Sequence, residues 1–136
     1  MDRSVDERHL SLAVAAVATV GSLYFSLGMG LEPCDLCWYQ RILMYPLVVV
    51  FGVSLVRRDD PWAYALPLSA PGFVVASYHN YLEQTPAEAG GVCTGGVPCD
   101  VPVYVLDGLV TIPQLSLTAF GLINLAYLSR HVTTSR

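Results

Sequence analysis

Four cysteines are the residues of this chain best suited to chemistry, and they fall in two pairs. Cys34 and Cys37 stand two residues apart in EPCDLCWYQR, whereas Cys93 and Cys99 bracket a short glycine-rich stretch in VCTGGVPCD. A two-residue gap is typical of redox-active dithiols, because it brings the sulfurs together and lets one thiolate be stabilised against the other. The spacing favours two local pairs, although four cysteines allow three pairings and the sequence alone does not choose among them.

Positive charge is expected close to the first pair. Pro33 suits the start of a helix, which would place Cys34 in the first turn, where the helix dipole and free amide groups favour a thiolate. Arg41 follows Cys37 by four residues, so its guanidinium would share a helical face with that thiol and approach either Cys37 or an anion beside it. The sequence therefore predicts a thiol and a permanent positive charge within one turn of each other.

The second pair is predicted to form a small, exposed disulfide ring that a thiol of another protein can attack. It lies in the connection 83–111, and connections of this length in compact proteins are generally functional or disordered. We expect function here, because the connection carries two of the four cysteines. Residues 101–110, VPVYVLDGLV, suit a membrane surface without distinguishing helix from strand.

Four apolar stretches flank these cysteines. The chain has 136 residues, of which 54% are hydrophobic and 13% charged, and a mean hydropathy of +0.51. So few charges do not cover the surface of a small soluble domain. The expected fold class is all-α, an integral membrane four-helix bundle that forms one domain over residues 1–136. Its spans, which must cross a hydrocarbon core of roughly 30 Å, are predicted at residues 10–31, 38–56, 62–82 and 112–128.

The distribution of arginines predicts the orientation. Arginines occur in both terminal tails and in the connection after the second span, whereas the connection 83–111 has none. By the positive-inside rule both termini face the cytoplasm. The two cysteine-bearing loops, 32–37 and 83–111, are then extracytoplasmic, where disulfides form and persist. A cleaved signal peptide over residues 1–31 is the less favoured alternative, because its apolar run is longer than such peptides carry.

Simpler roles compete with a redox function. The four cysteines are not expected to bind zinc, because five residues separate the second pair and structural zinc motifs use two to four. They could instead be disulfides that only brace the loops. Arg41 could be an anchor that reaches the lipid interface, and His79 an interfacial histidine without a task. Nucleic acid is not an expected partner, since the basic residues are few and are explained by topology.

A family resemblance adds to these observations. The stretch PCDLCWYQR at residues 33–41, with MYP at 44–46, resembles the thiol-oxidase motif of the DsbB family of disulfide bond formation proteins, particularly its shorter BdbC-like branch. The segments SYHNYLEQ, VPCD and TIPQLSLTAF follow in the same order as in that family. The resemblance covers about the whole chain.

The resemblance implies an enzyme that reoxidises a DsbA-like thioredoxin-fold carrier and passes the electrons to a membrane quinone, ubiquinone or menaquinone. On that pattern the carrier attacks Cys93 in the Cys93–Cys99 disulfide, and the electrons pass by exchange to the Cys34–Cys37 disulfide. Cys37 would be the thiolate that meets the quinone. Two further side chains bind that quinone in the same pattern: Arg41 stabilises its reduced form and His79 helps to hold its ring.

Two other functions stay open. A quinone-linked reductase of the vitamin K epoxide reductase type uses similar chemistry on four helices, but here the closely spaced pair precedes the second span instead of lying in a late helix. A small structural membrane protein would use its disulfides only as braces. Redox lability distinguishes a structural protein from a redox relay, because bracing disulfides resist mild reductant and a relay's disulfides exchange readily.

Overall fold

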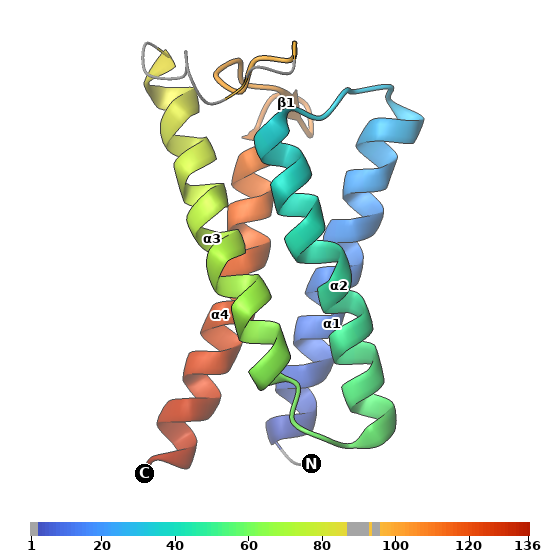
Figure 1. Ribbon diagram of the computed structural model, residues 1–136, viewed down its shortest axis with the longest axis vertical. Helices are drawn as coiled ribbons and strands as arrows, with labels where there is room; N and C mark the ends of the chain where they lie inside the picture. Colours follow the sequence, from blue (N-terminus) through green and yellow to red (C-terminus); the bar gives the residue numbers. More distant parts are fainter. Residues whose placement is uncertain (1–2, 87–92, 94–95) are drawn as a thin grey trace.

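The computed structural model describes residues 3–86, 93 and 96–136, and four long helices make up most of that part (Figure 1). Residues 87–92 and 94–95 of the predicted redox loop, Glu88 among them, lie outside the described residues. The helices are α1 (Arg3–Leu23, continued by the π-helical turn η1, Tyr24–Gly28), α2 (Asp35–Arg57), α3 (Trp62–Gln84) and α4 (Ile112–Thr134). The predicted all-α class with four helices is confirmed.

The ends of the helices follow from local sequence chemistry. α2 begins directly after Cys34, which is its extended N-cap residue, and it ends at Arg57, followed by the C-cap residue Arg58 in the left-handed conformation. Cys34 therefore precedes the first turn by one residue instead of lying within it as expected. α4 begins with a capping box, in which Thr111 and Gln114 each bind the other's backbone through the side chain, with Pro113 in the first turn.

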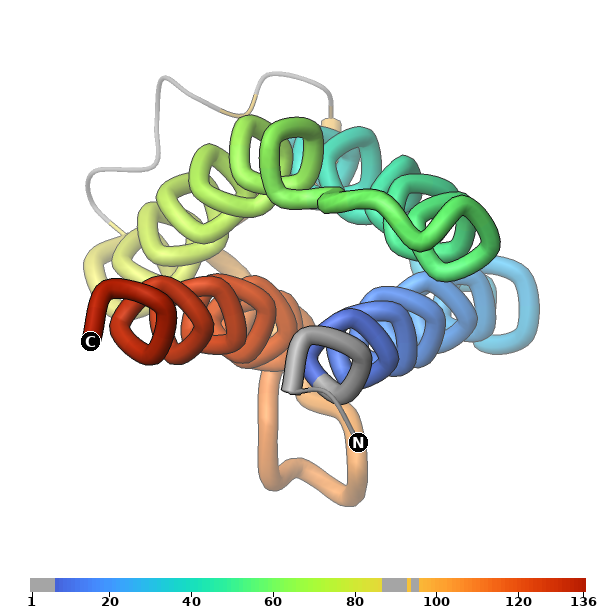
Figure 2. Tube along the Cα trace, turned by 90° about the horizontal axis from the view of Figure 1, so that it is seen from below, coloured from blue at the N-terminus to red at the C-terminus, as the bar shows by residue number. Residues whose placement is uncertain are grey.

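The four helices close into a ring in which each packs against its neighbours in sequence and α1 packs against α4 (Figure 2). Large side chains fill the centre, among them Leu47, Phe51, Phe120 and Ile123. α3 approaches α4 closely at Gly72, where a Cβ atom would lie 2.1 Å from the Phe120 ring. Glycine is the residue that lets these two helices pack at that distance.

The outer faces of the helices are apolar. Val17, Val20, Val49, Val56 and Leu125 are all exposed, as side chains that face lipid would be. Within the part of the chain that the structure describes, three helices are long and apolar enough to cross a membrane: Glu7–Gly28, Asp35–Arg57 and Ile112–Thr134. The chain is a multi-pass membrane protein.

The two termini lie at one end of the bundle and the loops that carry the cysteines lie at the other (Figure 1). At the end of the termini, Arg130 forms an ion pair with Asp60 at 2.8 Å. Arg8 donates a hydrogen bond of 2.8 Å to the carbonyl of Asp59. The turn between α2 and α3 is thus bonded to both α1 and α4.

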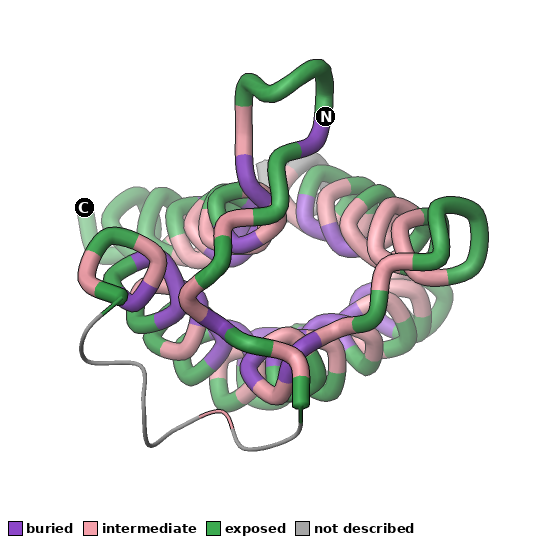
Figure 3. The backbone as a smooth tube through the Cα atoms, turned by 90° about the horizontal axis from the view of Figure 1, so that it is seen from above, coloured by how far each residue is buried: buried purple, intermediate pink, exposed green. Residues whose placement is uncertain are grey.

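After the second cysteine pair the chain forms a short hairpin that projects sideways beside α1 and α4 (Figures 2 and 3). Strand β1 (Tyr104–Val105) pairs antiparallel with β2 (Val110–Thr111). Three consecutive residues with positive φ make its turn, ending at Gly108 with φ 86°. The segment that sequence left undecided between helix and strand is therefore a β-hairpin, which leads directly into α4.

Candidate active site

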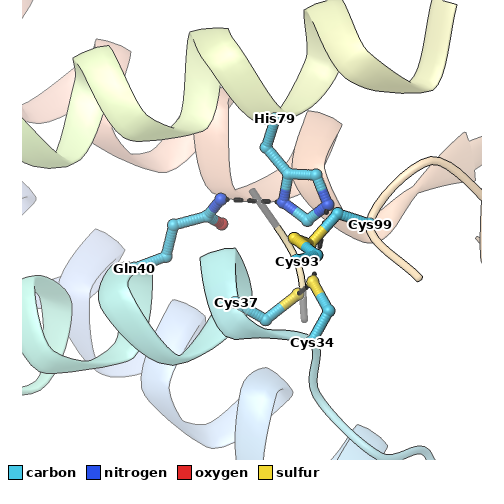
Figure 4. The surroundings of a disulfide bond; sticks show 6 residues. All are labelled: Cys34, Cys37, Gln40, His79, Cys93 and Cys99. Atoms are coloured by element: carbon cyan, nitrogen blue, oxygen red, sulfur yellow. Dashed lines mark hydrogen bonds between the residues drawn. A yellow bond between two sulfur atoms is a disulfide. The ribbon is translucent and has the colours of Figure 1, made fainter. Parts of the chain in front are cut away.

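All four cysteines meet at the end of the bundle opposite the termini (Figure 4). A disulfide joins Cys93 to Cys99, six residues apart in sequence. Cys34 and Cys37 are free thiols whose sulfurs lie 3.2 Å apart and share a hydrogen bond. The structure thus contains one oxidised and one reduced pair, and both pairings are local.

The second loop folds inward over the first. Cys99 is only 2% exposed and packs with Cys34, Leu36 and Leu82 in a small apolar cluster. The expectation of an exposed disulfide ring is therefore wrong for Cys99, because this cluster covers its sulfur. Cys93 remains partly exposed. An incoming thiol reaches Cys93 more readily than Cys99.

The two cysteine pairs come within reach of each other at Cys34. The sulfurs of Cys34 and Cys99 and a ring nitrogen of His79 all lie within 4.8 Å of one another. Cysteine and histidine at such distances suit a soft metal ion, but Cys99 is bound in the disulfide and offers no thiolate. The proximity instead suits disulfide exchange between the loops.

His79, from α3, lies between the thiols and a buried amide. Its Nε2 is 3.7 Å from the Cys34 sulfur, and its Nδ1 is 3.0 Å from the side-chain nitrogen of Gln40 on α2. His79 and Gln40 are 3% and 5% exposed, so neither ring nor amide depends on water for these contacts. The histidine is therefore held by hydrogen bonds on both sides of its ring.

Cys34 is the acidic thiol of the reduced pair. The hydrogen bond with the Cys37 thiol lowers the pKa of Cys34 to about 4, burial opposes this shift, and the hydrogen bond with His79 adds to it. Backbone donors at the start of α2 favour the same charge. At neutral pH Cys34 is a thiolate and Cys37 is its hydrogen-bond donor.

A cavity of about 530 Å³ lies beside the reduced pair. Its walls come mainly from α1, α2 and α4, and apolar residues of the second loop, such as Val101 and Val103, also line it. Cys34, Cys37, Arg41 and His79 all line it. A mostly apolar lining with a few polar groups, here thiols and a guanidinium, is typical of a small-molecule site.

Arg41 is fixed at the wall of this cavity by α1. Its guanidinium donates to the carbonyl of Ser22 at 3.1 Å and to the hydroxyl of Ser26. It also lies 5.3 Å from the centre of the Trp38 ring. Ser22 and Ser26 flank the start of η1, and such wide turns are frequent at functional sites. The arginine is therefore held between α1 and α2 at the wall of the cavity.

Comparison with known proteins places this geometry in a family. Residues 8–130 match the family model described as disulfide bond formation protein DsbB. The chain belongs to the DsbB family. It is 44% identical to the disulfide bond formation protein C of Bacillus subtilis over 118 residues, 85% of either chain. A probable disulfide formation protein of Oceanobacillus iheyensis is 41% identical, over 84% of this chain and 81% of its own length. No solved structure matches significantly.

Sequence reasoning named six residues of this DsbB-family site, and the structure brings five of them together: Cys34, Cys37, His79, Cys93 and Cys99. Arg41 lies on the wall of the adjoining cavity. Gln40, Ser22 and Ser26 were missed. The polar amide of Gln40 inside an apolar helix was a usable signal, because such a group needs a buried partner. The serines gave none, since small polar residues are common in membrane helices.

Proposed function

We propose that this protein is a membrane thiol oxidase that transfers electrons from a reduced thioredoxin-fold carrier, through its two cysteine pairs, to a membrane quinone. The observation that carries this proposal is the approach of Cys34 to Cys99 within 4.8 Å beside a lined cavity. Free thiols at Cys34 and Cys37 argue against disulfides that only brace the loops. The family match favours thiol oxidation over vitamin K epoxide reduction.

The relay starts at the partly exposed sulfur. A thiolate of the carrier attacks Cys93, the Cys93–Cys99 bond breaks, and Cys99 leaves as a thiolate. Cys99 then attacks Cys34 in the oxidised form of the first pair, and Cys37 leaves as a thiolate. The second carrier thiol displaces Cys93 and leaves with the oxidised carrier.

Cys93 next attacks Cys99, which restores their disulfide and releases Cys34 as a thiolate. The carrier has now lost two electrons and two protons, and the first pair holds the electrons. This is the redox state in the structure, with Cys93–Cys99 oxidised and Cys34 and Cys37 reduced.

The cavity residues would hold the electron acceptor. A quinone supplies a two-electron, two-proton acceptor that regenerates the Cys34–Cys37 disulfide. Cys37 lies one turn from Arg41 on α2, so thiol and guanidinium meet the same volume. Arg41 would stabilise negative charge on a quinone oxygen, and His79 would contact the ring from α3.

We further propose that the cysteine end of the bundle faces outside the cytoplasm and both termini face inside. Arginines at the ends of the chain and at the α2–α3 turn support this orientation. The carrier is then an extracytoplasmic protein of the DsbA type.

Quinone reduction by the purified protein, with a reduced thioredoxin-fold donor, tests the function. Wild type should turn over, whereas Cys93→Ser should fail to accept electrons and Cys37→Ser should accept them without reducing quinone. Ser77→Ala, an exposed change on α3, is a control for handling in detergent. Turnover by either cysteine variant at the wild-type rate would refute the relay, as would an inactive wild type whose disulfide survives mild reductant.

A further inference from the structure

Gln40 is a buried amide whose place in an apolar helix needs an explanation. It lies in α2, where Leu36, Met44 and Leu47 are buried at neighbouring turns. Burying an amide without a hydrogen-bond partner is unfavourable, because the group loses its bonds to water. Its side-chain nitrogen lies 3.0 Å from His79 Nδ1, a contact that joins two helices.

This contact determines where the imidazole carries its proton. The amide nitrogen of glutamine has only donors, so His79 Nδ1 must accept the hydrogen bond. A neutral imidazole then carries its one proton on Nε2. Nε2 is the nitrogen that faces the Cys34 sulfur at 3.7 Å. The hydrogen bond from Gln40 therefore makes the Nε2–H group of His79 a hydrogen-bond donor toward the Cys34 sulfur.

We propose that Gln40 is a positioning residue, which holds the Nε2–H group of His79 toward Cys34 so that Cys34 leaves as a thiolate when the Cys34–Cys99 bond breaks. The inference rests on the proposed relay and deepens it. In that step Cys93 supplies the electron pair that forms the new bond to Cys99, and Cys34 keeps the pair of the broken bond. A donor at Cys34 stabilises that charge without transferring its proton.

Other groups also act on the Cys34 sulfur, and their effects must be distinguished from the effect of Gln40. The Cys37 sulfur lies 3.2 Å from that of Cys34, and the hydrogen bond between them lowers the pKa of Cys34. Glu83 on α3 interacts electrostatically with both His79 and Cys34, and its carboxylate accepts a hydrogen bond from Thr111. Arg41 lines the same cavity from α2. None of these groups supplies the hydrogen bond at Nδ1.

The pH dependence of Cys34 alkylation tests the proposal without a carrier or a quinone, so failure of the proposed function leaves this result readable. Full-length protein with the Cys93–Cys99 disulfide intact is treated with iodoacetamide across the acid range, and tandem mass spectrometry locates the label. The wild-type midpoint is expected at a pH of about 4. In Gln40→Leu the midpoint should rise by about one unit, which slows labelling below it about tenfold.

Gln40→Glu is the decisive second variant. A carboxylate accepts from Nδ1–H, so the ring can become an imidazolium that still donates from Nε2, and the midpoint should not rise. A negative charge that acted only through its field would raise it. Gln114→Leu makes the same side-chain change at the start of α4, away from His79, and should leave the midpoint in place.

A Gln40→Leu midpoint equal to that of wild type would overturn the proposal. Equal rises in Gln40→Leu and Gln40→Glu would also overturn it, because a side chain that bonds Nδ1 would then protect the Cys34 thiolate no better than an apolar one. If Gln40→Leu does not fold, the Gln40→Glu midpoint alone decides: a rise of one unit refutes the positioning role.

Discussion

Replacing Gly72 by alanine should separate α3 from α4 and destabilise the bundle. The added Cβ would lie 2.1, 2.4 and 2.6 Å from three atoms of the Phe120 ring. Ordinary contact begins at 3.4 Å, so the nearest ring atom must retreat by about 1.3 Å. Phe120 is fully buried, which leaves it no open space on its own side.

The magnitude follows from two opposing effects. Overpacking of a filled core costs about 1–3 kcal/mol, and the better helix propensity of alanine returns up to about 1 kcal/mol. We expect Gly72→Ala to lose about 1–2 kcal/mol of the free energy of unfolding. Gly121→Ala is a matched control on the facing helix, because its Cβ would meet Phe73 at an ordinary 3.6 Å.

Denaturant titration of the purified variants in detergent measures the difference. The double variant Gly72→Ala with Phe120→Leu should recover part of the loss, since the smaller side chain makes room for the methyl group; a double-mutant cycle gives the coupling. Equal stability of Gly72→Ala and Gly121→Ala would refute the packing inferred for these helices, as would a double variant that shows no coupling.

Three further predictions concern the site. Cys37→Ala should raise the pKa of Cys34 more than His79→Ala does, because the Cys37 hydrogen bond is the largest cause of its low value; the reverse order of alkylation midpoints would contradict this. Burial raises the pKa of Glu83, which lies just beyond the predicted span. The contribution of Glu83 to the stability of the fold is therefore fully present at pH values below its unfolded pKa, and it is lost as the pH rises through the folded pKa. Glu83→Gln should therefore gain thermal stability on wild type as the pH rises above about 4.5, and a loss over this range would show the sign to be wrong. Ser26→Ala removes one of the hydrogen bonds that hold Arg41 and should raise the KM for quinone about threefold to tenfold without changing the rate of Cys93–Cys99 reduction; an unchanged KM would exclude a role for Ser26.

The helices could be predicted from the sequence because their signals are long and local. Runs of apolar residues of the predicted lengths occur in α1, α2 and α4, and the structure gives a helix over each. The start of α2 was misplaced by two residues, because Pro33 suits a first turn but the extended conformation of Cys34 delays the helix until Asp35. Such signals can be read from the sequence because they depend only on residues that are close together in the chain.

Contacts between distant segments could not be read in the same way. Spacing favoured a Cys93–Cys99 pair, but it did not reveal that the second loop folds inward and buries Cys99 against Cys34. The contact between Gln40 and His79 joins residues 39 positions apart. Only the packing of α2 against α3 brings them together, and no periodicity in either helix records it.

The six-residue separation of Cys93 and Cys99 has a consequence for repeated turnover. A ring this small restrains the unfolded chain by only about 2 kcal/mol on the loop-closure relation. In the proposed relay, breaking and remaking this bond would remove only that contribution, because helix packing provides most of the stability of the fold. The Cys93–Cys99 bond can therefore serve as a reactive disulfide in the proposed relay, because the fold does not depend on it for its stability.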